Sequence, residues 1–413
     1  MSVKKHPSMG LKVLLITSLY PSGKNAMRGV FVRNQAILME RAGASLGVLV
    51  ARSYVPFWRR ASRRWASVSA RCELDDEFEL GKKTVCRAHL PGRLLFAASG
   101  PMIVRAIRRV AEAWHREVGF DVVLANQLLP VGYAAVKIAQ MLSLPAAVYA
   151  IGSDLERYPS FSRWAHSQAC WTLANADMVL TVSRKLAETA QRLHRPRRLE
   201  PLYYGCNLET FSTVQDDRSV LRAELRLPAE ATILCFCGGI SINKGMSELW
   251  QAFCRLKKTY PQLHLLLVGD GPLLGKLRRQ ARHQGLASDV TMTGFVPEVQ
   301  VARWLKASDI FVLPSYGEGM PMAMVEAMAI GRCVVASAVG GIPEIVTNGV
   351  NGRLVLPRDV DSLCTALSGV IEDSAGRDRM ALLGQQTVRQ QLDAASSAAK
   401  LVGFLSELSR SHS

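Results

Sequence analysis

The chain alternates short apolar runs with longer stretches in which apolar and polar residues are mixed. Each short run is rich in Val, Ile and Leu, and turn residues follow it. Such runs are typical of parallel strands buried on both faces, whereas the longer amphipathic or Ala-rich stretches are typical of helices. The pattern therefore predicts repeated strand–helix units and an α/β fold with parallel sheets.

The apolar runs form two series, and each series predicts one doubly wound, Rossmann-like lobe. The first series is KVLLITS, DVVLANQ, PAAVYAIGSD and DMVLTVS, and the second is TILCFCGG, LHLLLVGDG, VTMTGF, DIFVLPS and CVVASAVGG. Between them, residues 202–227 are polar and turn-rich, as at a domain boundary. We expect an N-terminal domain at residues 1–205, a C-terminal domain at 206–392 and a closing helix at 393–413 that packs back toward the N-terminal domain. Because ligands of open parallel sheets bind outside the carboxyl ends of the strands, we expect the active site in the cleft between the lobes.

Composition excludes several classes of protein. The 413 residues are 49% hydrophobic and 21% charged, which is ordinary for a globular chain. No uninterrupted apolar window is long enough for a spanning helix, and the N-terminus lacks the pattern of a signal peptide. Nine cysteines without a C-x-x-C pair and eight histidines without ligand spacing indicate neither a disulfide framework nor a metal site. These features favour a cytoplasmic location.

Positive charge is concentrated in the N-terminal half. The net charge is +17, and residues 1–200 contain 30 Lys and Arg against 14 Asp and Glu, whereas residues 201–413 contain 21 against 20. A field of this sign attracts phosphates, nucleic acids or anionic lipid surfaces without selecting among them.

One basic segment also contains aromatic residues. Residues 52–71 interleave six arginines with Tyr54, Phe57 and two tryptophans, and further arginines follow at 105, 108 and 109. Interfacial segments combine these residue types, and each basic side chain near an anionic leaflet contributes about 1 kcal/mol, so we favour reversible docking on a membrane. A solvated basic face with partly buried aromatics is the open alternative. The candidate docking residues are Trp58, Arg59, Arg60, Arg63, Arg64 and Trp65.

The stretch DIFVLPSYGEGMPMAMVEAMAIG carries the most chemistry. It predicts a strand, a glycine-containing turn and a helix that starts at Pro321, a residue favoured at the first helical position. The free N–H groups at Met322 and Ala323 and the helix dipole suit phosphate oxygens. Glu318 before the helix and Glu326 within it could each accept from sugar hydroxyls, which together describes a nucleotide-sugar pocket. A glutamate pair alone would equally suit a solvated helix face.

Glu318 and Glu326 also match a known motif, two glutamates separated by seven residues within E-G-x-P...E. By this motif the chain resembles the family 4 retaining glycosyltransferases of the GT-B fold. The resemblance covers nearly the whole chain, and its further motifs are GGIPEIV, NGVNGRLV, VGDGP, TGFV, IGSD, TVS and YGCNLETF. It implies two Rossmann-like lobes facing across a cleft and retaining transfer of a hexose from a nucleotide diphosphate sugar, which we expect to be UDP-linked, with no cofactor or metal.

The resemblance also implies roles for individual residues. Glu326 would bind the ribose hydroxyls, Glu318 the donor sugar, and Lys244 of the loop GGISINKG the diphosphate. Phe295 and Val296 would border the base. The expected catalytic residues are Glu318, Lys244 and Asp154, and the expected donor-binding residues are Glu326, Gly319, Met320, Pro321, Met322, Gly238, Gly239, Ser241, Phe295, Val296 and Gly29.

The chain departs from the family pattern at three positions. Gly239 stands where the phosphate loop usually carries arginine, which removes a bidentate phosphate donor. Ile151 and Asn126 stand where many relatives have histidine. Lys244 could alternatively be a surface lysine at a helix start, and Asp154 could cap the helix that follows it.

The N-terminal loop LYPSGKNAMRGVFVRNQ resembles the acceptor-side loop of the family. Gly29 would permit a close approach of acceptor and donor, and Arg28 and Arg33 would meet an acceptor phosphate or remain exposed at a helix start. The resembled bacterial subgroup builds exopolysaccharide, teichuronic acid and other cell-envelope polysaccharides. We therefore expect a lipid-linked saccharide acceptor and a peripheral location at the inner face of the plasma membrane.

Other functions fit the sequence less well. A nucleic-acid-binding protein would explain the charge, but no recognition motif is visible, so we expect no nucleic-acid partner. GDGPLLG has the wrong spacing for a dinucleotide fingerprint. Asp359 and Asp361 form a D-x-D, but they lie at a predicted helix start, where capping accounts for them. The remaining alternative is a basic α/β protein that binds nucleic acid or phosphate without transferase activity.

Overall fold

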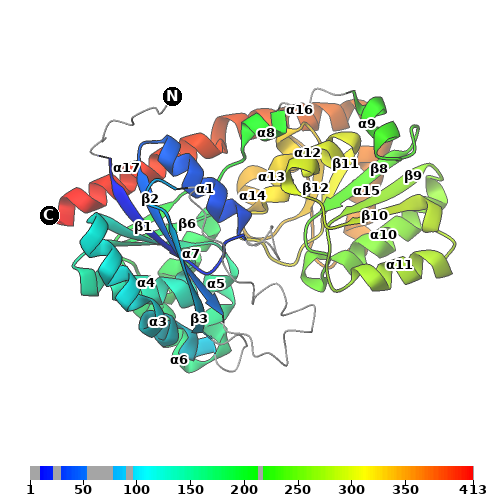
Figure 1. The fold of residues 1–413 in the computed structure, drawn as a ribbon. Coiled ribbons are helices and arrows are strands. Elements are labelled where there is room, and N and C mark those ends of the chain that lie inside the picture. The colour runs from blue at the N-terminus through cyan, green and yellow to red at the C-terminus, as the bar shows by residue number, and fades with distance from the viewer. Residues whose placement is uncertain (1–9, 22–28, 54–77, 90–95, 213–216, 413) are drawn as a thin grey trace. The chain divides into compact units, whose positions relative to one another are not determined.

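The computed structural model describes residues 10–21, 29–53, 78–89, 96–212 and 217–412. The chain divides into two compact units (Figure 1). The first unit comprises Met1–Tyr204 together with Ala395–Ser413, and the second comprises Gly205–Ala394.

The first unit contains a seven-stranded sheet in the order β3-β2-β1-β4-β5-β6-β7, and all its described pairs are parallel. Its strands are β1 (Lys12–Thr17), β2 (Ser45–Ser53), β3 (Lys82–His89), β4 (Val122–Asn126), β5 (Ala146–Ala150), β6 (Met178–Thr181) and β7 (Leu199–Pro201). Its helices include α1 (Val30–Arg41), α3 (Phe96–Val118), α4 (Tyr133–Leu142), α5 (Ser153–Glu156), α6 (Arg163–Asn175), α7 (Arg184–Leu193) and α17 (Ala394–His412). Every residue of β4, β5 and β6 is buried, which is why these strands have no polar alternation.

The second unit contains a six-stranded parallel sheet in the order β10-β9-β8-β11-β12-β13. Its strands are β8 (Thr232–Cys237), β9 (Leu263–Val268), β10 (Val290–Gly294), β11 (Ile310–Leu313), β12 (Cys333–Ser337) and β13 (Arg353–Val355). Its helices are α8 (Leu208–Ser212), α9 (Arg218–Glu224), α10 (Met246–Thr259), α11 (Leu274–His283), α12 (Glu298–Ala307), α13 (Met322–Ala329), α14 (Ile342–Ile345), α15 (Val360–Glu372) and α16 (Ser374–Gln391), with short 3-10 turns η4 (Ile242–Lys244) and η5 (Ala287–Asp289).

The two doubly wound parallel sheets confirm the predicted fold class. All nine apolar runs of the two series form strands, and the sheets gain β2, β3, β7 and β13 in addition. Of these four, β3 contains Lys82 and Lys83 and so lacks an apolar run. The Lys82 side chain is nevertheless buried, and its ammonium lies 5.0 Å from the centre of the Tyr20 ring. The cation–π contact with Tyr20 stabilises the buried Lys82 at a strand position where an apolar residue would be expected.

Helix α17 follows the second unit in the sequence and belongs to the first unit. Arg198 pairs with Glu407 at 3.1 Å and its guanidinium lies over the Phe404 ring, while Ser397 Oγ donates to the Tyr203 carbonyl. At the junction, Cys206 N–H donates to the Leu392 carbonyl at 2.7 Å, and Ala394 N–H donates to the Cys206 carbonyl at 3.1 Å. The departing and returning segments therefore lie side by side.

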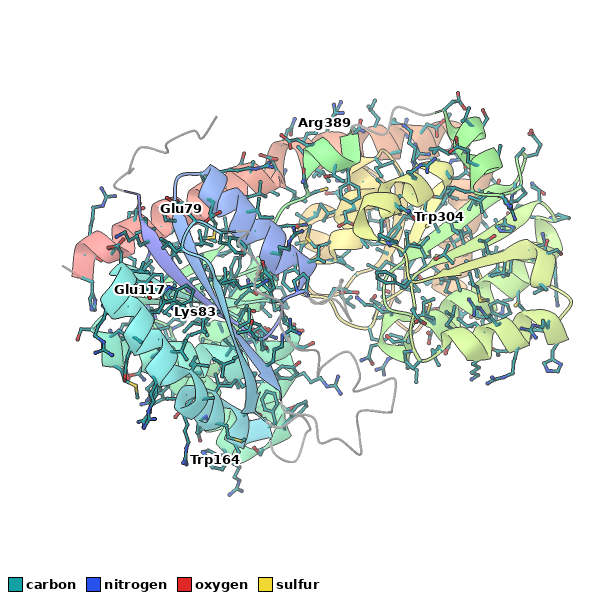
Figure 2. All side chains as sticks on the ribbon, in the orientation of Figure 1. Glu79, Lys83, Glu117, Trp164, Trp304 and Arg389 are labelled. Atoms are coloured by element: carbon teal, nitrogen blue, oxygen red, sulfur yellow. The ribbon has the colours of Figure 1, made fainter. Side chains whose placement is uncertain are left out.

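Charged side chains of the first unit include Lys83 and Glu117, which are labelled in Figure 2. Lys83 pairs with Glu117 of α3 at 3.5 Å. Arg105, Arg108 and Arg109 of the same helix are exposed and form no ion pair with a described residue. Within the part of the chain that the structure describes, no helix has both the length and the apolar character needed to cross a bilayer.

Candidate active site

The second unit has a topological switch point between β8 and β11. Strand order runs from β8 outward to β9 and β10 on one side and from β11 to β12 and β13 on the other. Loops that leave neighbouring strands at such a point diverge to opposite faces of the sheet and open a crevice at the carboxyl edge. Residues 238–245 follow β8, and residues 314–321 follow β11, so both predicted donor-site loops leave the sheet at this point.

Two predicted catalytic side chains meet at the switch point. Lys244 Nζ lies 2.6 Å from Glu318 Oε1, although the residues are 74 positions apart in the sequence. The Glu318 side chain is 9% exposed and that of Lys244 is 32% exposed, so the carboxylate is nearly enclosed while the ammonium still reaches solvent. Lys244 is therefore not an isolated surface lysine, because it neutralises a buried carboxylate.

The loop after β8 touches the loop after β11 at Gly245. Gly245 has a φ of 67°, and a Cβ there would lie 1.9 Å from the Pro314 carbonyl oxygen, so no side chain fits. Next to this contact, Tyr316 N–H donates to the Asn243 carbonyl at 2.9 Å. This close backbone packing fixes the position of the Lys244 backbone relative to the loop that carries Glu318. Gly239, by contrast, is exposed and has open space around it.

A second close approach holds the backbone of Glu318 from the other side. Gly340 follows β12 with a φ of 54°, and a Cβ there would lie 1.6 Å from the Glu318 carbonyl oxygen. The next residue, Gly341, donates its N–H to the Gly319 carbonyl at 3.1 Å. The glycines of the AVGG segment therefore support the Glu318 loop by allowing two backbones to touch.

Helix α13 begins at Met322, one residue later than predicted. Pro321 has a ψ of 101° and is the N-cap rather than the first helical residue, because its backbone is extended. The N–H groups of Met324 and Val325 donate back to the Pro321 carbonyl at 3.1 and 3.3 Å. Those of Met322 and Ala323 have no acceptor among the described residues. These two N–H groups and the positive end of the helix dipole can bind an anion.

Glu326 lies on α13 and faces the end of β8. Burial, the Cys235 thiol and the Glu326 carboxylate raise the pKa of Cys237, the last residue of β8, well above its ordinary value. Glu326 is half-buried, and it has interactions within the chain. Its carboxylate is therefore near enough to Cys237 to influence that thiol.

Phe295 and Val296 follow β10 at the same carboxyl edge. The Phe295 side chain is 52% exposed and Val296 is buried. Gly269 N–H donates to the Gly294 carbonyl at 3.0 Å, which joins the ends of β9 and β10. Gly269 in turn packs against Gly238. A Cβ at Gly269 would lie 2.1 Å from the Gly238 carbonyl oxygen. The exposed Phe295 ring is thus connected by backbone contacts to the start of the loop after β8.

A positioning contact was missed by the sequence analysis. Tyr316 Oη donates to Glu248 Oε1 at 2.7 Å, and the Arg358 guanidinium lies 4.5 Å from the centre of the Tyr316 ring. Glu248 is in the first turn of α10, so this bond ties the Glu318 loop to the helix that follows Lys244. No local sequence pattern indicates this contact, because Tyr316 and Glu248 are 68 residues apart in the chain.

In the first unit, Asp154 organises the loops after β4 and β5. Its carboxylate accepts from the backbone N–H groups of Leu128 at 2.6 Å, Gly152 at 2.8 Å and Ile151 at 3.1 Å. The side chain is 1% exposed, and burial raises its pKa to about 6 against the lowering effect of these amides. All three donors precede Asp154 in the chain, and the N-cap of α5 is Gly152, so Asp154 does not cap that helix.

Gly29 caps α1 where the chain returns to the end of β1. Its φ is 75°, and a Cβ would lie 2.4 Å from the backbone carbon of Leu19. The close approach that Gly29 permits is therefore one between two segments of this chain. Beside it, Ser18 Oγ donates to Gln127 Oε1 at 2.9 Å, and Gln127 has a φ of 124°, a strained value for a residue with a side chain.

Asn126, which stands at a position where relatives have histidine, is fully buried. Its Nδ2 donates to Tyr204 Oη at 2.6 Å and approaches Gln35 Oε1 at 3.4 Å. The Tyr204 ring stacks on Tyr149 with 4.7 Å between ring centres. Asn126 is therefore part of a buried polar network of the first unit.

The remaining predicted residues are placed as follows. Arg33 is half-buried on α1, and it has interactions within the chain. Ser241 is half-buried and precedes η4. Arg28 and the candidate docking residues Trp58, Arg59, Arg60, Arg63, Arg64 and Trp65 lie outside the described residues.

The D-x-D segment caps a helix, as predicted. Asp359 is the N-cap of α15, and its Oδ1 accepts from Ser362 N–H at 2.9 Å. Asp361 pairs with Arg255 at 2.5 Å on the surface. Among the residues that the structure describes, no three His, Cys, Asp or Glu side chains are grouped as metal ligands would be.

Two family models match the chain. The model described as Glycosyltransferase Family 4 matches residues 40–210, and the model described as Glycosyl transferases group 1 matches residues 231–373. A protein of Bacillus subtilis (strain 168) named as the teichuronic acid biosynthesis glycosyltransferase TuaC is 29% identical over 397 residues, which are 95% of this chain and 97% of that protein.

Solved structures with the same fold cover nearly all of the chain. Sucrose-phosphate synthase from Thermosynechococcus elongatus has a TM-score of 0.78 at 22% identity, over 97% of this chain and all of that one. HepE of Anabaena, solved in complex with UDP-glucose, has a TM-score of 0.72 at 21% identity, over 96% of this chain and all of that one.

Proposed function

Because this chain belongs to the glycosyltransferases of the GT-B fold, with a family 4 N-terminal region and a group 1 C-terminal region, we propose that it transfers a hexose from a UDP-sugar with retention of configuration. The observation that carries the proposal is the Lys244–Glu318 pair at the switch point, next to the open N–H groups of α13. The Anabaena protein of the same fold has been solved with UDP-glucose, which supports the choice of nucleotide.

In the proposed complex the donor separates this ion pair. The diphosphate binds the N–H groups of Met322 and Ala323 and takes Lys244 away from Glu318. The Glu318 carboxylate then accepts hydrogen bonds from hydroxyls of the donor sugar, and Glu326 accepts from the ribose. Lys244 thus pairs with the Glu318 carboxylate before the donor binds and with the diphosphate afterwards. Its positive charge has an anionic partner in both states.

The reaction breaks the bond between the anomeric carbon and the diphosphate oxygen. The acceptor hydroxyl oxygen forms the new glycosidic bond on the same face of the sugar, and its proton passes to the departing diphosphate. Lys244 and the N-terminus of α13 stabilise the negative charge that develops on the leaving group, so no metal is assigned to the step. We assign Asp154 a positioning role, because its enclosed carboxylate holds the loops after β4 and β5.

We further propose a lipid-linked saccharide acceptor for a cell-envelope or exopolysaccharide chain, used at the inner face of the plasma membrane. Two observations support this assignment. The chain is similar over almost its whole length to a protein named for teichuronic acid biosynthesis. In addition, the basic N-terminal half carries three exposed arginines on α3 that lack ion-pair partners among the described residues.

The two glutamates provide the test. UDP affinity is measured by calorimetry for the wild type, Glu326→Ala, Glu318→Ala and, as a control, Glu230→Ala, which removes an exposed carboxylate from the same unit. We expect Glu326→Ala to weaken UDP binding by about 10-fold or more, the value of a lost charged hydrogen bond. Glu318→Ala should retain UDP and lose transfer from labelled UDP-sugars. Equal UDP affinity in the wild type and Glu326→Ala would refute the ribose role.

A further inference from the structure

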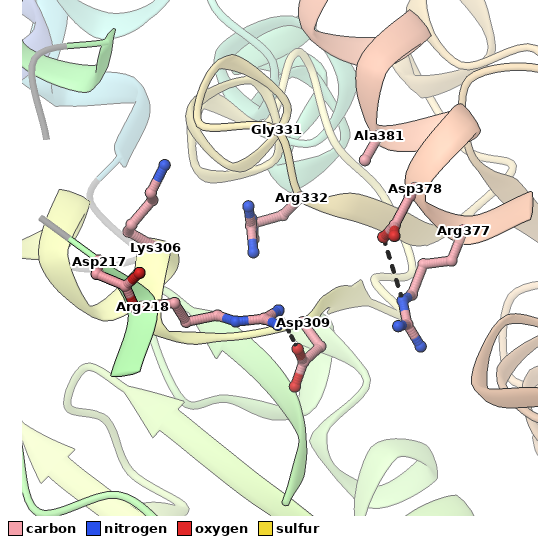
Figure 3. Close-up of a pocket in the computed structure, with 9 residues that line it drawn as sticks. All are labelled: Asp217, Arg218, Lys306, Asp309, Gly331, Arg332, Arg377, Asp378 and Ala381. Atoms are coloured by element: carbon pink, nitrogen blue, oxygen red, sulfur yellow. Dashed lines mark hydrogen bonds and ion pairs between the residues drawn. The ribbon is translucent and has the colours of Figure 1, made fainter. Parts of the chain in front are cut away.

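A cavity lies in the second unit, away from the candidate active site (Figure 3). Its volume is about 390 Å³, and its lining includes four cationic side chains, Arg218, Lys306, Arg332 and Arg377, and three carboxylates, Asp217, Asp309 and Asp378. Lys306 is in the last turn of α12, which leads into β11, and Arg332 immediately precedes β12. The cavity is therefore at the amino ends of these strands.

The cavity is separate from the candidate active site. Glu318 follows β11 at its carboxyl end, whereas Asp309 of the cavity immediately precedes the same strand. A strand of this length spans about 13 Å at ~3.3 Å per residue. Helix α13 runs between the two edges, with its N-terminus at the active site and its C-terminal end followed by Gly331 and Arg332 of the cavity.

One carboxylate of the cavity is already saturated. Asp309 Oδ1 accepts from Arg218 at 2.5 Å, and its Oδ2 accepts from Arg222 at 2.7 Å and from the Ile233 N–H at 2.7 Å. Two arginines thus share one anion. Arg377 lies 3.8 Å from Asp378, whose side chain is 79% exposed, so that pair neutralises little charge inside the cavity.

Lys306 and Arg332 carry charge that the described residues do not pair. Arg332 donates from Nη1 to the Ser308 carbonyl at 2.9 Å, but its Nε is buried and has no acceptor among the described residues. Lys306 forms no hydrogen bond or ion pair with any of them. Figure 3 shows both side chains lining the same hollow.

Burial is the main influence on the pKa values of Arg332 and Lys306, and the neighbouring cations and carboxylates act on them in opposite directions. Burial, assisted by the charge of Arg218, lowers the pKa of Arg332 to about 10. Burial and the charges of Arg332 and Arg218 also lower the pKa of Lys306, against the opposing charge of Asp217. An anion in the cavity would relieve the repulsion between the cations and accept hydrogen bonds from the Lys306 ammonium.

We propose that this cavity binds a small phosphorylated metabolite, held as a phosphomonoester dianion by Arg332 and Lys306. Neither cation forms an ion pair with a described residue, and phosphate oxygens accept well from both guanidinium and ammonium donors. The volume of about 390 Å³ is within the ~300–1,000 Å³ of small-molecule sites and leaves room for more than the phosphate group. The proposal does not depend on the donor-site assignment.

Calorimetric titration of the full chain tests the proposal. Glucose 6-phosphate and inorganic phosphate are the probes, and glucose is the uncharged control. We expect glucose 6-phosphate to bind more tightly than phosphate, and glucose not to bind. Arg332→Gln and Lys306→Gln should each weaken glucose 6-phosphate binding about 10-fold, as expected for a lost charged contact. Arg279→Gln removes an exposed cation of the same unit and should behave as the wild type.

A donor-site variant distinguishes this site from the active site. Lys244→Ala should lose UDP binding and keep glucose 6-phosphate binding, whereas the two cavity variants should do the reverse. Thermal melts of every variant confirm that it is folded. The proposal is overturned if the wild type does not bind glucose 6-phosphate, if Lys244→Ala abolishes that binding, or if both cavity variants bind as the wild type does. Equal affinities for phosphate and glucose 6-phosphate would overturn the assignment to a phosphorylated metabolite.

Discussion

Replacing Gly340 by alanine tests whether the loop after β12 fixes the backbone of Glu318. A Cβ at Gly340 would lie 1.6 Å from the Glu318 carbonyl oxygen, whereas Cβ contacts under 3.0 Å essentially never occur. The carbonyl must therefore move by at least 1.4 Å, the difference between these two distances. Because Gly341 donates to the Gly319 carbonyl, the displacement would extend along the loop toward α13.

The expected loss of unfolding free energy in Gly340→Ala has two parts. Gly340 has a φ of 54°, and an L-residue in the left-handed region costs about 1 kcal/mol. Forcing an extra carbon into a closely packed contact costs roughly 1–3 kcal/mol more. We therefore expect Gly340→Ala to lower the free energy of unfolding of the second unit by about 2–4 kcal/mol. A displacement of about an ångström at a catalytic group can also lower the transfer rate roughly 100-fold.

Gly285→Ala is the matched control, since Gly285 has a φ of 70° and no atom lies within 4 Å of the position that a Cβ would occupy there. It should show only the backbone part, about 1 kcal/mol. Urea denaturation measures both variants, and the transition of the second unit is identified by its shift when UDP is added. If Gly340→Ala is no less stable than Gly285→Ala, the close contact with Glu318 does not constrain the loop and the reasoning fails.

Two further predictions concern pH. Burial lowers the pKa of His264 to about 4, so the unfolded chain binds the proton first, and the second unit should lose up to about 3 kcal/mol of stability as the pH falls from about 6.5 to 4. Acid titration of unfolding should show this loss in the wild type and not in His264→Gln; parallel curves would contradict it. Burial raises the pKa of Asp154 to about 6, so its contribution to the stability of the first unit should decrease as the pH rises from about 4 to 6. Asp154→Asn should remove that dependence and, at neutral pH, cost about 1–3 kcal/mol by placing an amide N–H₂ against backbone donors, whereas an unchanged urea midpoint would show that the three amides do not need the carboxylate.

The hydrophobic pattern predicted the strands that are buried on both faces, because such strands appear in the sequence as continuous apolar runs. It did not single out β3, where Lys82 is buried by stacking over Tyr20, a contact between residues far apart in the chain. The start of α13 was predicted one residue early, since a proline suits both the N-cap and the first helical position and only its ψ decides between them.

The residues of the candidate site could be predicted from the sequence, but the contacts between them could not. Motif resemblance named Lys244 and Glu318, but their direct pairing depends on β8 and β11 being neighbours at the switch point. The cationic cavity could not be predicted. Lys306 and Arg332 each resemble an ordinary cation near a helix C-terminus, and only the order of β11 and β12 in the sheet brings them together.

The junction at Cys206 makes the second unit an insertion within the first. Leu401 and Leu405 of α17 are fully buried, so residues at the far end of the chain complete the core of the unit that begins it. During synthesis the second unit has all of its residues before the first does, since domains fold as units when their chain becomes available. The region translated first is therefore the last that can finish folding, and a gene fragment that stops at Tyr204 would encode a core without its closing helix.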